Sequence, residues 1–229
     1  VYPNRKNDAA SFFTFDELLA LDIGSWFNEA NPAQARESFI GEQVLTMEDI
    51  LMVAEGKRYL RERDLDPGLS DIEGIKRKMD MTDTDITNYN TANPGANAFR
   101  GLDGRTVYRN DEFDNGNRPG VYIETKAPYL FGGIEAELAK LLTDAGWYHD
   151  DPAQMKVIPT TPGKVGIANT KARIILQTFD GSSLHNLATS FNRLLPILYL
   201  YGDIGSTPAT YANKINFAIK TGATIMGPN

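Results

Sequence analysis

A carboxylate and an ammonium group lie two residues apart in Val121-Tyr-Ile-Glu-Thr-Lys126. Because successive side chains of a strand point to opposite faces, Tyr122, Glu124 and Lys126 share one face, and an apolar face lies behind them. In a β/α barrel the apolar face would meet the helices, so both charged groups would point inward near the carboxyl end of the strand, where barrel active sites lie. The alternative is a structural Glu–Lys pair that fills the barrel mouth. The spacing alone does not separate these readings.

The segments that follow this strand alternate between strand and helix patterns. They predict a strand over 121–125, a helix over 134–146, a strand over 173–179, a helix over 182–193, a strand over 195–201, a helix over 208–221 and a strand over 223–226. This order is typical of a parallel sheet with helices packed outside it, either open and doubly wound or closed into a barrel. The glycine-rich phosphate loops of nucleotide-binding folds do not occur in the sequence.

The first half of the chain is less regular. Thr14-Phe-Asp-Glu17 and Thr46-Met-Glu-Asp49 predict helices over 15–22 and 47–64, and Ser70-Asp-Ile-Glu73 opens a shorter one. Residues 81–119 are rich in Asn, Asp, Thr, Gly and Pro without a sustained period, which predicts a loop or an insertion. Four acidic residues of this segment suggest a calcium site: Asp83, Asp85, Asp111 and Asp114. No EF-hand pattern is present, so a solvated loop is expected instead.

The composition restricts the class of protein. The 229 residues are 41% hydrophobic, which suits an ordinary globular domain, and the net charge of -7 argues against a nucleic-acid partner. The basic run Lys76-Arg-Lys78 is expected on a solvated helix face. No apolar run is long enough to predict a transmembrane segment, and the absence of cysteine excludes disulfides and thiolate chemistry. The start at Val1 suggests processing or an incomplete sequence.

Five stretches of the sequence resemble, in order, motifs of the glycerophosphodiester phosphodiesterases, particularly the long secreted or periplasmic type. Ile123-Glu-Thr-Lys-Ala-Pro128 is similar to the E-I-K-x-P strand motif of that family. The other four stretches are Val1-Tyr-Pro-Asn-Arg5 with Phe13-Thr-Phe-Asp-Glu-Leu18, Gly41-Glu-Gln-Val-Leu-Thr-Met-Glu-Asp-Ile-Leu51, Ile175-Leu-Gln-Thr-Phe-Asp180 and Leu195-Pro-Ile-Leu-Tyr-Leu200. The resemblance covers residues 1–56 and 120–229, and about 57–118 is expected to be an enlarged insertion within a single domain.

This resemblance implies an α/β fold, a TIM (β/α)8 barrel of the phosphatidylinositol-phosphodiesterase-like type, represented in part. It implies that Glu124 is a ligand of a divalent metal, Ca²⁺ before Mg²⁺, and that Lys126 is catalytic by neutralising the phosphate. Gln177 and Phe179 share a strand face and are candidate substrate-binding residues, although packing within the strand core is the expected role of Phe179. The implied reaction is hydrolysis of a glycerophosphodiester to glycerol 3-phosphate and an alcohol, in a periplasmic or secreted protein.

The catalytic histidines of the family lie in an H-R-G turn and an H-D turn upstream of the segment that Val1 resembles, so neither turn is expected in this sequence. His149 is expected in a loop and His185 on a solvent-facing side of a helix, and neither is expected to be catalytic. The predicted strands would not close a barrel, so the sequence is expected to omit the ends of a longer protein, or to be a degenerate relative that pairs with another chain, which leaves homo-oligomerisation open. The alternatives are a non-catalytic binding or structural protein and a sphingomyelinase-D-like phospholipase.

Overall fold

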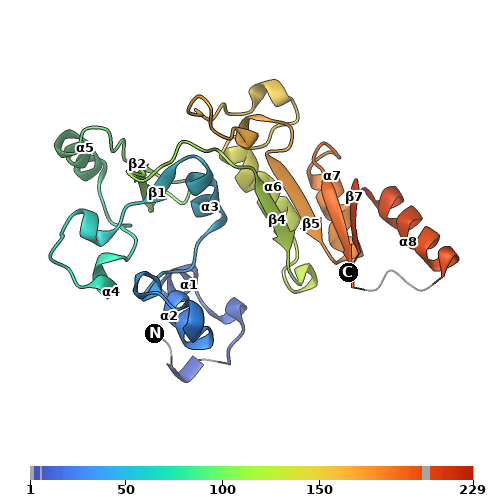
Figure 1. Cartoon of the computed structure of the whole chain (residues 1–229), viewed down its shortest axis with the longest axis horizontal. Helices are drawn as coiled ribbons and strands as arrows, with labels where there is room; N and C mark the ends of the chain where they lie inside the picture. Colours follow the sequence, from blue (N-terminus) through green and yellow to red (C-terminus); the bar gives the residue numbers. More distant parts are fainter. Residues whose placement is uncertain (1–2, 6, 203–206, 229) are drawn as a thin grey trace. The chain divides into compact units, whose positions relative to one another are not determined.

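The computed structural model describes residues 3–5, 7–202 and 207–228, and the chain divides into two compact units. Unit 1 comprises residues 1–53 and 57–114, and unit 2 comprises residues 54–56 and 115–229. The elements of the first unit are α1 (Phe15–Leu19), α2 (Gly24–Ala30), α3 (Met47–Ala54), β1 (Lys57–Tyr59), α4 (Asp71–Gly74), α5 (Asp83–Ala92), β2 (Phe99–Arg100) and β3 (Val107–Asn110) (Figure 1). Those of the second are β4 (Val121–Thr125), α6 (Ile134–Asp144), β5 (Ile174–Thr178), α7 (Gly181–Ser190), β6 (Ile197–Tyr201), α8 (Pro208–Thr221) and β7 (Ile225–Pro228).

Short 3-10 helices join these elements: η1 (Pro3–Arg5), η2 (Ala10–Phe12), η3 (Pro32–Gln34), η4 (Glu37–Phe39), η5 (Glu62–Asp64), η6 (Pro128–Leu130), η7 (Pro152–Gln154) and η8 (Ile167–Asn169). In the part of the chain that the structure describes, no helix is long and apolar enough to cross a membrane.

Unit 1 contains a three-stranded antiparallel sheet in the order β1-β3-β2. The prediction of a loop over 81–119 is therefore wrong where this segment forms α5, β2 and β3. Helix α5 begins with a capping box between Thr82 and Asp85, but buries only Ile86 and Tyr89, so its apolar period is too weak to recognise. The strands depend on partners distant in sequence, since Tyr59 of β1 pairs with Tyr108 of β3. The segment predicted as an insertion thus has a hydrophobic core of its own, which includes Leu60, Met81, Ile86, Tyr89 and Val107.

Two further predictions in unit 1 are wrong. The helix expected over 47–64 ends at Ala54, because Gly56 adopts a φ of +75° and residues 57–59 then pair with β3. Arg77 does not lie on a solvated face: its guanidinium is buried and binds the Asp49 carboxylate, with Nη2 and Oδ2 2.7 Å apart. The α1 and α4 helices are present, and α1 starts with the predicted Thr14–Glu17 capping box.

Unit 2 confirms the predicted alternation of strands and helices. Its strands form a four-stranded parallel sheet in the order β4-β5-β6-β7, so the α/β class is confirmed. The bounds agree with the sequence predictions to within a few residues, and those of α8 match them fully. Among the described residues the sheet is open, with β4 and β7 at its edges.

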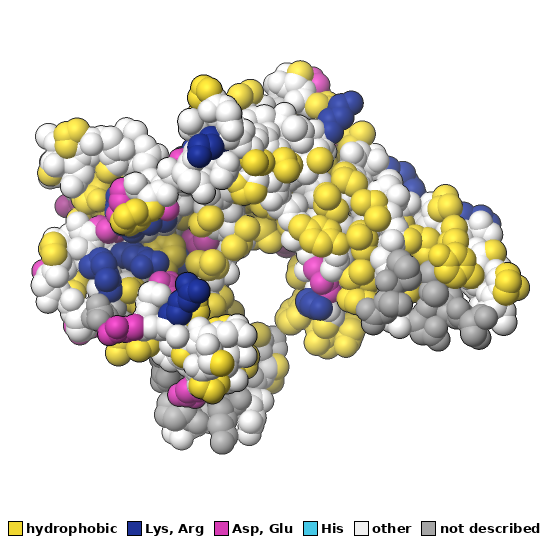
Figure 2. Space-filling model, in the orientation of Figure 1, with side chains coloured by type: hydrophobic (Ala, Val, Ile, Leu, Met, Phe, Trp, Pro, Cys, Tyr) yellow, Lys and Arg dark blue, Asp and Glu magenta, His cyan; other side chains and the backbone are white. Residues whose placement is uncertain are grey.

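The two faces of this sheet differ. On one face, Val121, Ile123 and Thr125 are buried, and the Thr125 hydroxyl lies 2.9 Å from the Ser183 hydroxyl of α7. That face is the helix-covered one, as the period of two predicts. The opposite face carries apolar side chains that are only partly buried or are exposed: Tyr122, Ile175, Leu198 and Leu200. Figure 2 shows hydrophobic side chains gathered over the sheet of this unit.

Candidate active site at the carboxyl edge of the parallel sheet

The site residues predicted from the sequence lie together where β4 and β5 end. Glu124 of β4 is the register partner of Gln177 of β5, and the Gln177 amide nitrogen donates a hydrogen bond of 2.6 Å to Glu124 Oε2. The ammonium of Lys126 lies 2.8 Å from Glu124 Oε1, and 5.6 Å from the ring centroid of Phe179. Two neighbouring parallel strands therefore deliver a carboxylate, an ammonium, an amide and an aromatic ring to one edge of the sheet. We name Glu124, Lys126, Gln177 and Phe179 the β4–β5 cluster.

The charges of this cluster are unequally exposed. The Glu124 side chain is 22% exposed, whereas that of Lys126 is 77% exposed. Glu124 Oε1 is buried, and among the described residues no group donates a hydrogen bond to it, although Lys126 is its ion-pair partner. A buried carboxylate oxygen normally has hydrogen-bond partners. The Lys126 ammonium at 2.8 Å is therefore the group that compensates the charge on Oε1, and because the lysine side chain is largely exposed, this ammonium keeps donors directed to solvent.

The backbone after β4 turns sharply at Ala127. This residue has φ 43° and ψ 49°, a left-handed conformation that costs free energy for any residue other than glycine. The next residue, Pro128, is buried and starts η6. The turn ends the strand directly after Lys126, so it fixes where the ammonium leaves the sheet. The sequence reasoning did not identify this conformation, although a proline after a strand is a turn signal.

Asp180, the last residue of the Gln-Thr-Phe-Asp segment, has a structural role. Its carboxylate accepts a hydrogen bond of 2.8 Å from the Ser183 amide and caps the N-terminus of α7. Its own amide donates to the Thr178 hydroxyl at 3.1 Å. These bonds fix the link between β5 and α7, and so the position of Phe179. Phe179 is half exposed, so the role expected for it in strand-core packing is wrong.

A metal site is not complete in these residues. Among the described residues, no group of three His, Cys, Asp or Glu side chains is placed to hold a metal ion. Ca²⁺ takes six to eight oxygen ligands, and Glu124 offers one carboxylate. The acidic residues of the predicted loop are engaged elsewhere: Asp83 pairs with Arg100 at 2.6 Å, and Asp85 caps α5.

Both histidines lie where the sequence placed them. His149 is exposed in a loop, and its Nδ1 accepts a hydrogen bond of 3.0 Å from the Asp151 amide. His185 is exposed on α7, where it lines a cavity of about 520 Å³ with Phe217 and Thr221 of α8. No contact joins either of them to the β4–β5 cluster in the described part of the chain.

Comparison with known proteins adds no family to this description. No protein-family model matches the sequence, and no curated protein matches it either.

Proposed function

We propose that this chain carries part of the active site of a metal-dependent phosphodiesterase of the glycerophosphodiester phosphodiesterase type. The observation that carries the proposal is the convergence of Glu124, Lys126 and Gln177 at the carboxyl edge of a parallel sheet. Active sites of parallel α/β folds lie at this edge. The motif resemblance gives the substrate, a glycerophosphodiester, and the extracellular or periplasmic location.

Lys126 is the group that binds the phosphodiester. A phosphodiester is an anion, and attack on phosphorus spreads negative charge over its oxygens, which a fixed ammonium stabilises. Glu124 fixes the ammonium from one side at 2.8 Å, and Gln177 fixes Glu124 through its hydrogen bond of 2.6 Å. Lys126 therefore presents its remaining donors in a restricted direction, and Phe179 provides an apolar wall beside it.

The reaction adds water across the phosphodiester. The oxygen of water bonds to phosphorus, the bond from phosphorus to the alcohol oxygen breaks, and a proton ends on the released alcohol. No general acid or base is assigned to the described residues. We propose only one ligand for the metal. Glu124 would bind a divalent cation, Ca²⁺ before Mg²⁺, and it does not make a cation site alone.

The proposal also places β4 to β7 as consecutive strands of a (β/α)8 barrel. Their parallel order supports it, as do the helix contacts on one face and the polar Glu124 and Gln177 on the other, near the strand ends. The cluster would then face the barrel interior.

A second candidate is a non-catalytic protein that binds the same anion. The absence of a three-ligand metal group among the described residues favours it. Both candidates use Lys126 for binding, and turnover separates them.

The test is release of glycerol 3-phosphate from glycerophosphocholine by the native protein, with Ca²⁺ and with a chelator. Lys126→Met should lower kcat/KM by about a hundredfold. The matched control is Lys140→Met, which removes another exposed lysine of unit 2 with a carboxylate partner, Asp144. Equal activity of the two variants would overturn the role of Lys126, and binding without turnover would favour the second candidate.

A further inference from the structure

A cavity of about 520 Å³ lies between α7 and α8, two helices of unit 2 that Figure 1 labels. It is lined by Gly181, Ser182, His185 and Asn186 of α7 and by Phe217 and Thr221 of α8. Its volume is within the range of small-molecule sites, about 300–1,000 Å³. No lysine, arginine, aspartate or glutamate of the described residues lines it, so the cavity offers no charge to a ligand.

The polar side chains of α7 are open to a ligand. Ser182, His185 and Asn186 lie at positions i, i+3 and i+4, so they share one face of the helix. All three are exposed, and their side chains form no hydrogen bond or ion pair with the rest of the described chain. A hydroxyl, a neutral imidazole and an amide can each donate and accept hydrogen bonds. Three groups of both kinds are therefore available on one wall of the cavity.

Phe217 provides the apolar part of the opposite wall. Its ring centroid lies 5.8 Å from that of Tyr199, and the residue remains 45% exposed. A Cβ atom on Gly181 would lie 3.0 Å from the ring and 3.4 Å from the Tyr199 hydroxyl. Tyr199 is 8% exposed, and no group in the described part of the chain forms a hydrogen bond with its hydroxyl. The absence of a side chain at Gly181 thus leaves room for the ring and keeps this hydroxyl uncovered from that side.

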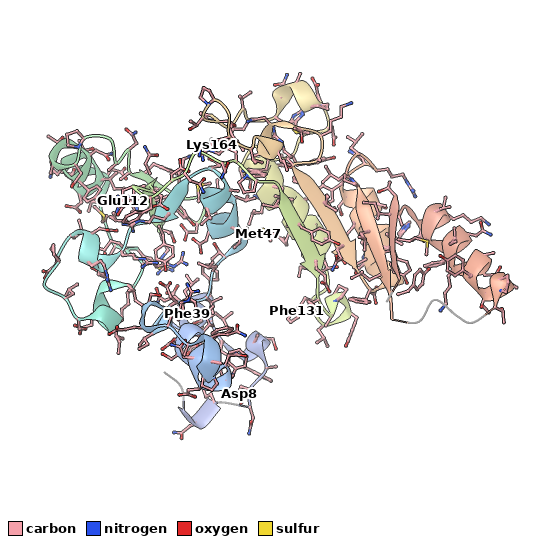
Figure 3. The ribbon with its side chains drawn as sticks, viewed as in Figure 1. Asp8, Phe39, Met47, Glu112, Phe131 and Lys164 are labelled. Carbon is pink, nitrogen blue, oxygen red and sulfur yellow. The ribbon has the colours of Figure 1, made fainter. Side chains whose placement is uncertain are left out.

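The cavities of unit 1 lack this combination. In one of about 590 Å³ beside α5, Lys78 pairs with Asp80 at 2.7 Å and Asp85 caps the helix, so its charged groups are already engaged. In another of about 360 Å³ beside Phe39, which Figure 3 labels, the Arg36 guanidinium lies 5.7 Å from the ring centroid. Open polar groups beside an open aromatic ring are found in the α7–α8 cavity.

We infer that the α7–α8 cavity binds a neutral saccharide. Sugar hydroxyls both donate and accept, as do the three side chains of α7, and the C–H face of a sugar ring is apolar and can lie on an aromatic ring. An anion finds no cationic side chain there, and the Asp180 carboxylate already caps the N-terminus of α7 beside the cavity. A flat base would need an aromatic group on each face, and Phe217 is the only aromatic side chain among the described residues that line the cavity.

The test is saturation-transfer difference NMR of the full chain with glucose, galactose, N-acetylglucosamine, maltose and cellobiose, each at about 10 mM. At least one of these sugars should bind with a Kd on the order of 1 mM, because one aromatic ring and a few neutral hydrogen bonds support only weak affinity. The protons of the C–H face should receive the most saturation. No binding of any of the five sugars, or binding of adenosine alone, would overturn the inference.

Two variants locate the site. Asn186→Ala should weaken binding by about fivefold, because it removes an exposed amide and no packing. Phe217→Leu should weaken it by about tenfold, because it removes the ring face. Asn213→Ala and Tyr211→Leu are the matched controls on α8: both residues are exposed, Tyr211 by 43%, and neither lines the cavity. Equal binding by the variants and their controls would overturn the assignment.

This inference does not depend on the proposed function, and the two fail separately. Lys126→Met should bind the sugar as the wild type does, since no contact joins His185 of the cavity to the β4–β5 cluster among the described residues. Sugar binding without hydrolysis of a phosphodiester would leave the cavity assignment standing and remove the enzyme. Hydrolysis without sugar binding would overturn the cavity assignment alone.

Discussion

Asp49→Asn removes the negative charge from a buried ion pair in unit 1. The side chains of Asp49 and Arg77 are each 2% exposed, and both nitrogens at the end of the guanidinium donate to the carboxylate, at 3.1 and 2.7 Å. The Tyr108 hydroxyl donates to the same carboxylate at 2.7 Å. In the variant, the guanidinium remains buried without a counter-charge.

The expected cost follows from this burial. Breaking a buried ion pair by changing one partner costs about 3–5 kcal/mol, because the remaining charge is uncompensated. If unit 1 opens as one body, amides in β1 and β3 should exchange with deuterium at least about a hundredfold faster. Hydrogen exchange with mass spectrometry on residues 57–60 and 106–110 measures this rate. Segments of unit 2 serve as the internal reference.

A matched control has the same chemistry at the surface. Asp16 pairs with Arg105 at 2.6 Å, but the two side chains are 59% and 49% exposed, so Asp16→Asn should cause no measurable change. The double change Asp49→Leu/Arg77→Met should recover part of the protection, because neither charge of the pair remains, while the Tyr108 hydroxyl loses its acceptor. Equal exchange rates in Asp49→Asn and Asp16→Asn would refute the reasoning.

Three more predictions concern single groups. Glu124→Gln should abolish the effect of Ca²⁺ on activity while leaving the thermal midpoint without metal nearly unchanged, since its partner Lys126 is largely exposed; retention of the Ca²⁺ effect would remove Glu124 as a ligand. Burial, reinforced by the Asp49 charge, raises the pKa of Tyr108 in the folded protein. The stability that this hydroxyl contributes should therefore be complete below about pH 10 and be lost as the pH rises towards the folded-state pKa. Between pH 8 and 11 the urea midpoint should fall by less in Tyr108→Phe than in the wild type, and an equal fall would contradict this prediction. Asp180→Ala removes the N-cap of α7 and should destabilise unit 2 by about 1 kcal/mol in urea unfolding, and no change would mean that the cap contributes nothing.

The sequence predicted unit 2 well because its signals are local. The apolar and polar residues of β4 alternate over five residues, and α8 begins at a proline and ends before a glycine. The period of two also placed Glu124 and Lys126 on one face, and the structure adds the hydrogen bond between Glu124 and its register partner Gln177. The roles of these side chains remain predictions.

Other features could not be read from the sequence because they depend on distant partners. The burial of Arg77 requires Asp49, 28 positions earlier, so a basic run looked like a solvated face. Strand β3 has partners on both sides, β1 and β2, that only tertiary structure brings to it. The turn over residues 129–131, which joins β4 to α6, carries a local signal, three large apolar residues before two glycines, but its exposure does not follow from that signal.

Anion binding by Lys126 is the claim on which the proposed function depends. It is measured most directly by calorimetric titration of glycerol 3-phosphate into the native protein, the Lys126→Met variant and the Lys140→Met control. A charge-assisted contact with phosphate predicts a Kd weaker by about tenfold or more in Lys126→Met and unchanged in Lys140→Met. No binding by the wild type, or the same Kd in both variants, would contradict the assignment of the β4–β5 cluster as a phosphodiester site.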